Sequence, residues 1–299
     1  MSESTESSGI QMLLKILNDI ITRRDIPDGP VEFRLHSALR EVKNINAINT
    51  GKAIIHIICS EYRGENRGPI FYRLLEKIVR EYGADVNLPD RDGCSPLCLV
   101  IRKCLTPHTN EFEFETQLQL VRILIAAGAN LKELFKGKTL LEWAIMTYNP
   151  YPIIDLLIKH GSFAVETLNA SLDLVLLDGM LSYKPAVWNT YNIVKIILKA
   201  GADPARITMN DPKTGEIVNK TPLHCAVEAN FAAICKLLRK YGANPKEKGT
   251  HDSTPIQLAE NMPEAVITNL QFKYQGPRII DPTLFKPDLA MSTLEVLYE

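Results

Sequence analysis

Residues 221–246 read TPLHCAVEANFAAICKLLRKYGANPK, and this stretch decides the fold. Thr221 offers a side-chain oxygen that can cap a helix, and Pro222 stands at the first helical position, where its missing N–H costs nothing. A break near Asn230 leads into a second segment with helical apolar spacing. That segment stops at Gly242, where a left-handed C-terminal cap is expected. The stretch therefore predicts two short helices joined by a turn.

The same residues carry a family resemblance. The string TPLH, the alanine two residues after it and the closing GAN resemble the ankyrin repeat, whose period is about 33 residues. The string NINAINTGKAIIH at residues 44–56 is similar to the family's repeat junction, with Asn46 at its asparagine, Gly51 at its turn glycine and His56 at the TPLH histidine. The resemblance implies a solenoid. An end unit of a solenoid must not expose an apolar face, so residues 10–48 are expected to be a divergent capping pair.

Five glycines mark the ends of second helices and place the repeats in register. They are Gly83, Gly128, Gly161, Gly201 and Gly242. The residues eight, five and four positions before each glycine are apolar in every copy, which predicts five equivalent faces buried against neighbouring repeats. These residues are Leu75, Ile78, Val79, Leu120, Ile123, Leu124, Ile153, Leu156, Leu157, Ile193, Ile196, Ile197, Ile234, Leu237 and Leu238. We predict an all-α fold, an ankyrin-repeat solenoid of stacked helix pairs with β-hairpin finger loops.

The chain divides into four predicted regions. These are a disordered, Ser- and Glu-rich tail at 1–9, the capping helix pair at 10–48, about six repeats at 49–275 and a C-terminal tail at 276–299 that does not match the repeat.

Some repeats are longer than the family period requires. The extra length predicts inserts between the two helices at residues 64–69, 105–115 and 178–188. The connection between Gly201 and Thr221 is also long and holds DPKTGE, which predicts an extended finger hairpin.

The composition excludes several classes of function. The 299 residues carry 34 basic and 35 acidic side chains, so electrostatics gives no reason to expect nucleic acid or an anionic membrane as the main partner. No apolar run approaches the roughly 20 residues that span a bilayer, so we expect no membrane insertion. The polar N-terminus and the six cysteines, which lack a disulfide pattern, predict a soluble, cytoplasmic protein in a reducing compartment. We expect a monomer.

Residues that could carry chemistry are few. In the resemblance, His56 and His224 stand where the family uses the ring to bond locally and stiffen the turn. The residues with metal-ligand chemistry that lie near one another are Cys94, Cys98, Cys104 and His108. Their spacing matches no common zinc pattern, and no nucleophile elbow, P-loop, zincin or kinase string occurs. We therefore expect no catalytic residue, no metal and no cofactor.

The resemblance implies a scaffold or adaptor that binds a protein partner on an extended concave surface of finger tips and first-helix faces. A narrower version is a bacterial effector that acts in the host cytosol, suggested by the Ile-, Lys- and Asn-rich composition and the non-repeat tail. The alternative is an enzyme whose site is built from the inserts, with Cys104, His108 and Glu113 as its candidate residues.

The family's register also selects candidate contact residues. The exposed positions near the turn glycine and on the first helices are Lys52, Glu61, Arg91, Arg102, Lys103, Phe135, Lys136, Lys138, Met146, Lys220 and Glu228. Positive charge gathers around the apolar pair Phe135 and Met146, so the predicted partner segment is acidic and apolar. The competing interpretation is that these are ordinary solvated residues.

A second candidate surface comes from the inserts. Phe112 and Phe114 alternate with acidic residues in NEFEFE and would waste apolar area in a solvated loop. We expect them either to pack against Tyr183 and Trp188 or to form a contact surface at the edge opposite the fingers.

Overall fold

The computed structural model describes residues 3–22, 28–48, 51–61, 68–103, 111–147, 150–181, 187–211, 214–249 and 252–261. The chain divides after Ser162 into two compact units. Unit 1 precedes this division and unit 2 follows it, and each is described by itself.

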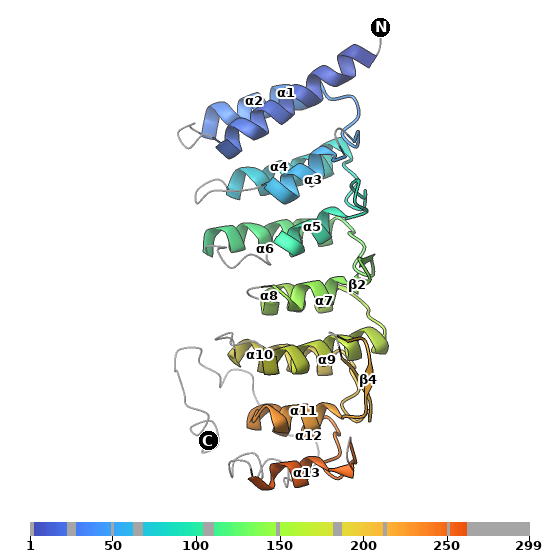
Figure 1. Ribbon diagram of the computed structural model, residues 1–299. Coiled ribbons are helices and arrows are strands. Elements are labelled where there is room, and N and C mark those ends of the chain that lie inside the picture. The colour runs from blue at the N-terminus through green and yellow to red at the C-terminus, as the bar shows by residue number, and fades with distance from the viewer. Residues whose placement is uncertain are drawn as a thin grey trace. The chain divides into compact units, whose positions relative to one another are not determined.

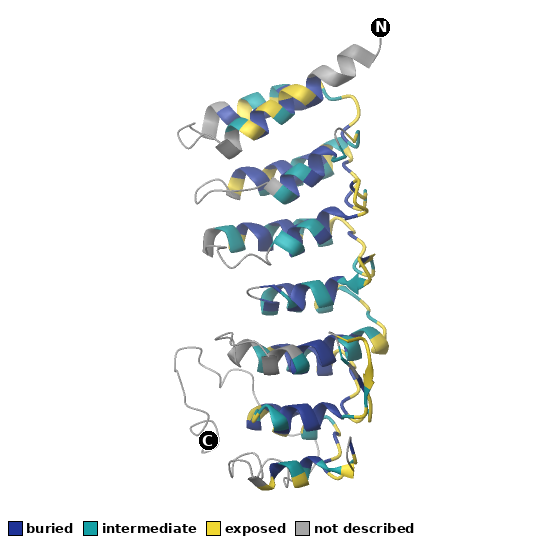
Figure 2. Cartoon of the chain, in the orientation of Figure 1, coloured by how far each residue is buried: buried dark blue, intermediate teal, exposed yellow. Residues whose placement is uncertain are grey.

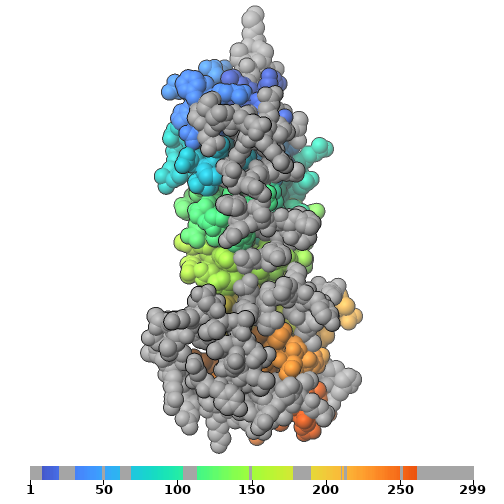
Figure 3. Space-filling view, turned by 90° about the vertical axis from the view of Figure 1, so that its left-hand side faces the viewer, coloured from blue at the N-terminus to red at the C-terminus, as the bar shows by residue number. Residues whose placement is uncertain are grey.

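Within its described residues, unit 1 consists of four helix pairs and one β-hairpin. Its helices are α1 (Glu3–Thr22), α2 (Asp28–Arg40), α3 (Ile54–Glu61), α4 (Gly68–Tyr82), α5 (Pro96–Lys103), α6 (Glu111–Ala126), α7 (Leu140–Ile145) and α8 (Pro150–His160). The pairs lie in layers in chain order (Figure 1) and form successive bands in the space-filling view (Figure 3). The first helices α3, α5 and α7 pack in one row, and the second helices α4, α6 and α8 pack in another.

The described part of unit 2 repeats this arrangement. Its helices are α9 (Val165–Leu181), α10 (Val187–Lys199), α11 (Pro222–Glu228), α12 (Ala232–Lys240) and α13 (Pro255–Leu258), followed by a 3-10 turn at Ala259–Asn261. First helices α9, α11 and α13 pack in order, and α10 packs on α12. The finger hairpin that the sequence predicts is present, with β3 (Met209–Asn210) antiparallel to β4 (Ile217–Val218).

Side-chain caps explain where the first helices begin. The Thr221 hydroxyl accepts the His224 backbone N–H, and Pro222 occupies the first turn, as the sequence predicts. The same capping box forms between Thr139 and Glu142 at the start of α7. These local hydrogen bonds fix the starts of α7 and α11, which are only six and seven residues long. Helices this short would have little stability from intrinsic helix propensity alone.

At the closing glycines, the backbone conformation ends the second helix. Gly242 has a φ of 105°, and the next amide, that of Ala243, bonds back to Leu238 O at 3.0 Å. This is the paired C-terminal cap that needs a left-handed residue. Gly83, Gly128 and Gly201 share the positive φ, whereas Gly161 does not.

Eleven of the fifteen positions of the apolar register are buried, and the other four, Val79, Ile123, Leu156 and Ile196, are half-buried. The residue eight positions before each closing glycine is at most 4% exposed in all five copies, namely Leu75, Leu120, Ile153, Ile193 and Ile234. In Figure 2 buried residues line the helix faces between layers, while exposed residues gather on the connecting turns. The repeats are therefore held by apolar contact between like faces of neighbouring helices.

Asparagine side chains add a polar link between successive repeats. The Asn46 side chain accepts the Asp85 N–H at 2.8 Å and donates to Gly83 O at 3.2 Å. One repeat later, Asn87 Oδ1 accepts the Asn130 N–H at 2.7 Å. Each of these amides lies in a turn, where no ladder or helix would satisfy it.

The structure differs from the sequence expectation at the N-terminus. Helix α1 begins at Glu3, so helix occupies most of the range expected to be a disordered tail.

The insert predictions need a similar correction. Helix α6 starts at Glu111, inside the expected loop 105–115, and α9 continues to Leu181, inside the expected insert 178–188. Extra length in these repeats is therefore partly built as helix. The end of the predicted repeat region 49–275, from residue 262 on, and the tail at 276–299 lie outside the described residues.

Candidate functional site

The repeats share a contact between the turn before a first helix and the end of that helix. Lys52 Nζ donates to Ser60 Oγ at 3.1 Å, eight residues on. In unit 2 the same spacing brings Lys220 Nζ to 2.7 Å and 2.8 Å from the two carboxylate oxygens of Glu228. The turns and the first helices therefore form one surface in each unit, which we call the finger face.

On the finger face of unit 1, the next repeat has Cys94 and Arg102 in these two places. Arg102 Nη1 donates to Cys94 Sγ at 3.7 Å. A hydrogen bond with Cys98 lowers the pKa of the buried Cys94 thiol, burial opposes this, and Arg102 lowers the pKa further. The following repeat has Lys138 and Met146 at the equivalent positions, both half-buried. The finger face of unit 1 thus carries cations in three successive repeats.

Arg102 is held by aromatic rings of the following repeat. Its guanidinium carbon lies 4.6 Å from the centre of the Phe135 ring and 5.3 Å from that of Trp143. Trp143 Nε1 donates to Phe135 O at 3.1 Å, which fixes the two rings relative to each other. Lys136 Nζ lies 5.5 Å from the Phe135 ring centre. We call these four residues the Arg102 cluster, in which stacked cations and rings attract one another.

A tight hairpin turn presents part of the cluster. β1 (Leu134–Phe135) pairs with β2 (Lys138–Thr139), so Lys136 and Gly137 alone connect the strands. Their φ angles are 50° and 73°, the pattern of a turn with two left-handed residues. A left-handed lysine carries backbone strain, which is often found at binding sites.

Acidic groups close to the cluster are engaged in local structure. Glu133 accepts a hydrogen bond from the Ser95 hydroxyl, and burial raises the pKa of its carboxyl. Asp90 Oδ1 accepts the N–H groups of Asp92 at 2.9 Å and Cys94 at 2.8 Å. Among the described residues, the buried Arg102 Nε has no hydrogen-bond partner. The cluster therefore keeps a net positive character.

The structure places the predicted contact residues in different environments. Arg91 and Lys136 are exposed, while Lys103, Lys220 and Glu228 are half-buried, and the Glu61 side chain lies outside the described residues. Lys220 and Glu228 belong to unit 2 and neutralise each other.

Two findings correct the predicted site. Phe135 is only 5% exposed because Arg102 and Trp143 cover its ring, so it is not an exposed contact residue. The sequence reasoning also missed Trp143, which shares the surface through its bond to Phe135. The sequence did contain a signal for Trp143. It follows Phe135 by eight residues, the same separation as that between Lys220 and Glu228.

The second predicted surface changes as well. Phe112 and Phe114 lie in α6 and not in a loop, and Phe114 is half-buried. Trp188 lies in α10, and its side chain, that of Phe112 and the whole of Tyr183 lie outside the described residues. The expected contact between these aromatic residues stays a prediction.

Comparisons with known proteins identify the fold. The family model described as ankyrin repeat matches residues 219–249. The ankyrin-repeat domain of human ASB11 is similar in structure, with a TM-score of 0.51 and 16% identity over 89% of this chain and 99% of that one. An ankyrin-repeat domain from Acinetobacter baumannii AYE has a TM-score of 0.53 and 22% identity over 78% of this chain and 98% of that one. This chain has the ankyrin-repeat fold. Among curated proteins, none matches it.

The two histidines of the ankyrin TPLH position are structural. His56 Nδ1 accepts the Ala53 N–H at 3.0 Å, and its Nε2 bonds Leu88 O in the next repeat at 2.8 Å. His224 is bound in the same way, with Nε2 at 3.1 Å from Ser253 O. Burial lowers the pKa of both rings, so each is neutral and donates from Nε2.

This arrangement predicts a stability change with pH. Above about pH 6.5 the histidines are neutral in both the folded and the unfolded chain, so they cause no pH dependence. Below that value the unfolded chain takes up protons that the buried rings resist, so stability falls as the pH drops. The urea midpoint should decrease between about pH 7.5 and 5.5, and less steeply in His224→Gln. A midpoint that stays constant over this range would contradict the neutral assignment.

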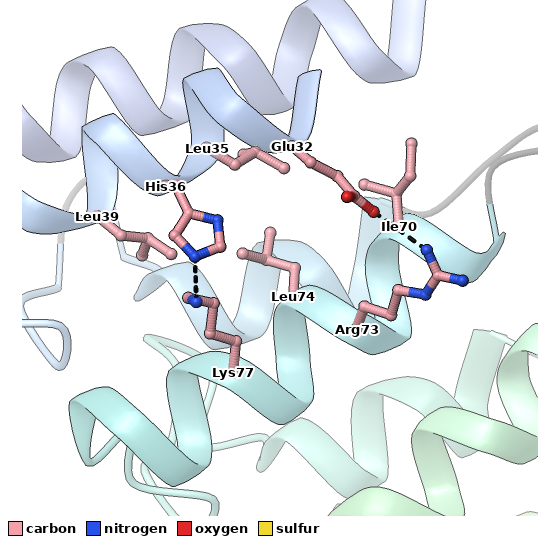
Figure 4. A pocket seen from close by; sticks show the side chains of 8 residues that line it. All are labelled: Glu32, Leu35, His36, Leu39, Ile70, Arg73, Leu74 and Lys77. Atoms are coloured by element: carbon pink, nitrogen blue, oxygen red, sulfur yellow. Dashed lines mark hydrogen bonds and ion pairs between the residues drawn. The ribbon is translucent and has the colours of Figure 1, made fainter. Parts of the chain in front are cut away.

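A shallow pocket of about 180 Å³ lies between second helices α2 and α4 of the ankyrin stack. Its floor is the apolar set Leu35, Leu39, Ile70 and Leu74 (Figure 4). Its rim is occupied by two polar pairs, Glu32 with Arg73 at 3.1 Å and His36 with Lys77. The polar groups of the rim bond to one another. We therefore interpret the pocket as a packing gap between the first two helix pairs.

The described residues contain no group of three or more metal-ligating side chains. Among the same residues, no helix is long and apolar enough to cross a membrane.

Proposed function

We propose that this ankyrin-repeat protein is a scaffold that binds an acidic segment of a protein partner on the finger face of unit 1. Ankyrin repeats generally act as protein–protein interaction modules, and the Arg102 cluster is the observation that carries the proposal. It joins two consecutive repeats into one surface, with a guanidinium fixed on two rings. Arginine and aromatic residues are the types that most often anchor interfaces.

The charges of the finger face support an acidic partner. Arg91, Arg102, Lys136 and Lys138 belong to the turns and first helices of unit 1, and among the described residues none of these four forms an ion pair with a carboxylate. The described ion pairs of unit 1 lie on α1, α2, α4 and α8 instead. In unit 2, by contrast, Lys220 is neutralised by Glu228. An acidic segment therefore gains more from unit 1.

The aromatic residues act mainly by holding the guanidinium. Because Phe135 is covered, it fixes the orientation of Arg102 and leaves the outer guanidinium edge to a partner carboxylate. Half-buried Trp143 and Met146 add apolar area beside it. Fixing the donor before binding lowers the entropy lost on association.

We propose binding rather than catalysis. Of the residues suggested for an insert-based enzyme, Cys104 and His108 lie outside the described residues, and Glu113 lies in α6. The finger face supplies fixed charges and rings, which recognise a ligand but offer no nucleophile with an adjacent base.

The test is partner affinity in charge variants. Arg102→Gln combined with Lys138→Glu should weaken binding of a partner captured by the wild-type chain by about tenfold or more, because both cations face the bound segment. The measurement is titration of the purified partner, with circular dichroism to confirm that each variant folds.

A matched control is available in unit 2. Exchanging the charges by Lys220→Glu with Glu228→Lys keeps an ion pair at the same register positions, so affinity should remain at the wild-type value. If the unit 1 variant binds as tightly as wild type, or if the unit 2 exchange weakens binding equally, the finger face of unit 1 is not the site.

A further inference from the structure

Two cysteine side chains contact each other beside the Arg102 cluster. Cys94 lies in the turn before α5, and Cys98 lies in the first turn of that helix. Both are free thiols, and a side-chain hydrogen bond joins them. Each of these cysteines is at most 1% exposed. Neither thiol contributes to the proposed binding of an acidic segment.

Local hydrogen bonds hold the backbone on both sides of the thiol pair. The Cys94 N–H donates to Asp90 Oδ1 at 2.8 Å, and the Cys98 N–H donates to Ser95 Oγ at 3.1 Å. The turn and the helix start are therefore fixed relative to each other. A disulfide can form only between cysteines whose side chains point toward each other, and this pair meets that condition.

The two thiols differ in acidity. The hydrogen bond with Cys98 lowers the pKa of Cys94, burial opposes this, and Arg102, whose Nη1 lies 3.7 Å from the Cys94 sulfur, lowers the pKa further. The same hydrogen bond and burial raise the pKa of Cys98. Because the thiolate and not the thiol attacks an oxidant, Cys94 is the nucleophile of the pair.

We propose that Cys94 and Cys98 form a modification site that hydrogen peroxide closes into a reversible disulfide. The Cys94 thiolate attacks one peroxide oxygen, the O–O bond breaks, and the other oxygen leaves as hydroxide, which takes up the proton that Cys94 released. The Cys98 thiol then attacks the sulfur of the resulting sulfenic acid and gives the disulfide and a second water. The two sulfur atoms are oxidised and the two peroxide oxygens are reduced. A dithiol reductant reverses the reaction by thiol–disulfide exchange.

The position of Cys94 gives a small oxidant its route. Cys94 follows the exposed turn 91–93, and exposed turns open more readily than the helices that they connect. Three other described cysteines lie inside helices, where burial raises the pKa of Cys59 and raises those of Cys225 and Cys235 to about 12. These thiols stay protonated at neutral pH and are expected to be inert.

The disulfide also changes the charge around Arg102. It removes the ionisable sulfur to which Arg102 Nη1 donates, so the guanidinium loses an anionic neighbour and attracts a partner carboxylate more strongly. This consequence rests on the proposed function, whereas the disulfide itself does not. Oxidation should accordingly raise the affinity of the finger face for its acidic segment.

The test maps the disulfide in the purified full chain after treatment with hydrogen peroxide. Trypsin releases residues 92–102 as one peptide, which contains Cys94 and Cys98 but not Cys104. When the treated chain is unfolded and alkylated, this peptide should be lighter than the reduced peptide by two hydrogen atoms and should take up no alkyl group. Dithiothreitol should restore both thiols. Cys225 is the internal control and should be alkylated fully with or without peroxide.

Two variants assign the roles of the residues, with circular dichroism to confirm that each folds. In Cys98→Ser the oxidation of Cys94 should stop at the sulfenic acid, which dimedone traps as an adduct on the 92–102 peptide. Arg102→Gln should slow the oxidation by about threefold, because the smaller thiolate fraction is only partly offset by a more nucleophilic thiolate.

The proposal is overturned if the wild-type 92–102 peptide keeps both thiols under peroxide, or if Cys94 becomes linked to Cys104 instead. It is also overturned if Cys225 is oxidised as fast as Cys94. None of these measurements needs a partner, so their failure leaves the proposed function standing. Conversely, unchanged partner binding in the finger-face variants would leave the disulfide standing.

Discussion

Arg206→Met should destabilise unit 2 by about 3–5 kcal/mol, since it leaves a buried carboxylate without its counter-ion. Arg206 pairs with Asp173 of α9, and their side chains are only 12% and 4% exposed. Burial lowers the pKa of Arg206 to about 10, so it remains charged at neutral pH. Its guanidinium also donates to Asn169 O at 3.2 Å and Asp203 O at 2.6 Å. Methionine fills similar space but satisfies none of these acceptors.

Urea unfolding in a Trp143→Phe background measures this effect, because fluorescence then comes only from Trp188 in unit 2. The exposed pair Lys248 and Asp252 in unit 2 gives the control, with side chains 66% and 85% exposed. Lys248→Met should cost less than about 1 kcal/mol. Equal losses in the two variants would show that the Arg206 pair is not buried in solution.

Leu237→Ala should destabilise unit 2 by about 2–5 kcal/mol through the loss of buried methyl groups and the cavity that they leave. Leu237 is 5% exposed, and the leucine after it is fully buried between the same helices. The exposed Lys240, three residues on, supplies the control in the same helix. Lys240→Ala should change the unfolding free energy by no more than about 0.5 kcal/mol. A Leu237→Ala loss within that range would mean that the register of α12 is wrong.

The parts of the fold that depend on local signals could be predicted from the sequence. Thr221, Pro222 and Gly242 act through interactions within a few residues of themselves. The start and the end of this helix pair can therefore be predicted without knowing which other repeats pack against it. The apolar spacing before each closing glycine likewise predicts burial, because the equivalent apolar face of a neighbouring repeat packs against it.

The site could be predicted only in part, because its decisive contacts join different repeats. The register placed Arg102 and Phe135 on the same face but could not show that the guanidinium lies on the ring and buries it. The start of helix α6 was misplaced for another reason. Residues 105–115 were assigned to an insert because the repeat is longer than the family period, whereas part of that length forms the first turns of α6.

The asparagine links have a consequence for how the stack comes apart. The backbone N–H of Asp85 donates its hydrogen bond to the Asn46 side chain in the preceding repeat, so it is left unsatisfied when that repeat unfolds. The apolar faces are shared between neighbours in the same way. Loss of one repeat therefore lowers the stability of the next, and within a unit opening is expected to spread from a weak repeat to its neighbours instead of starting independently at each pair.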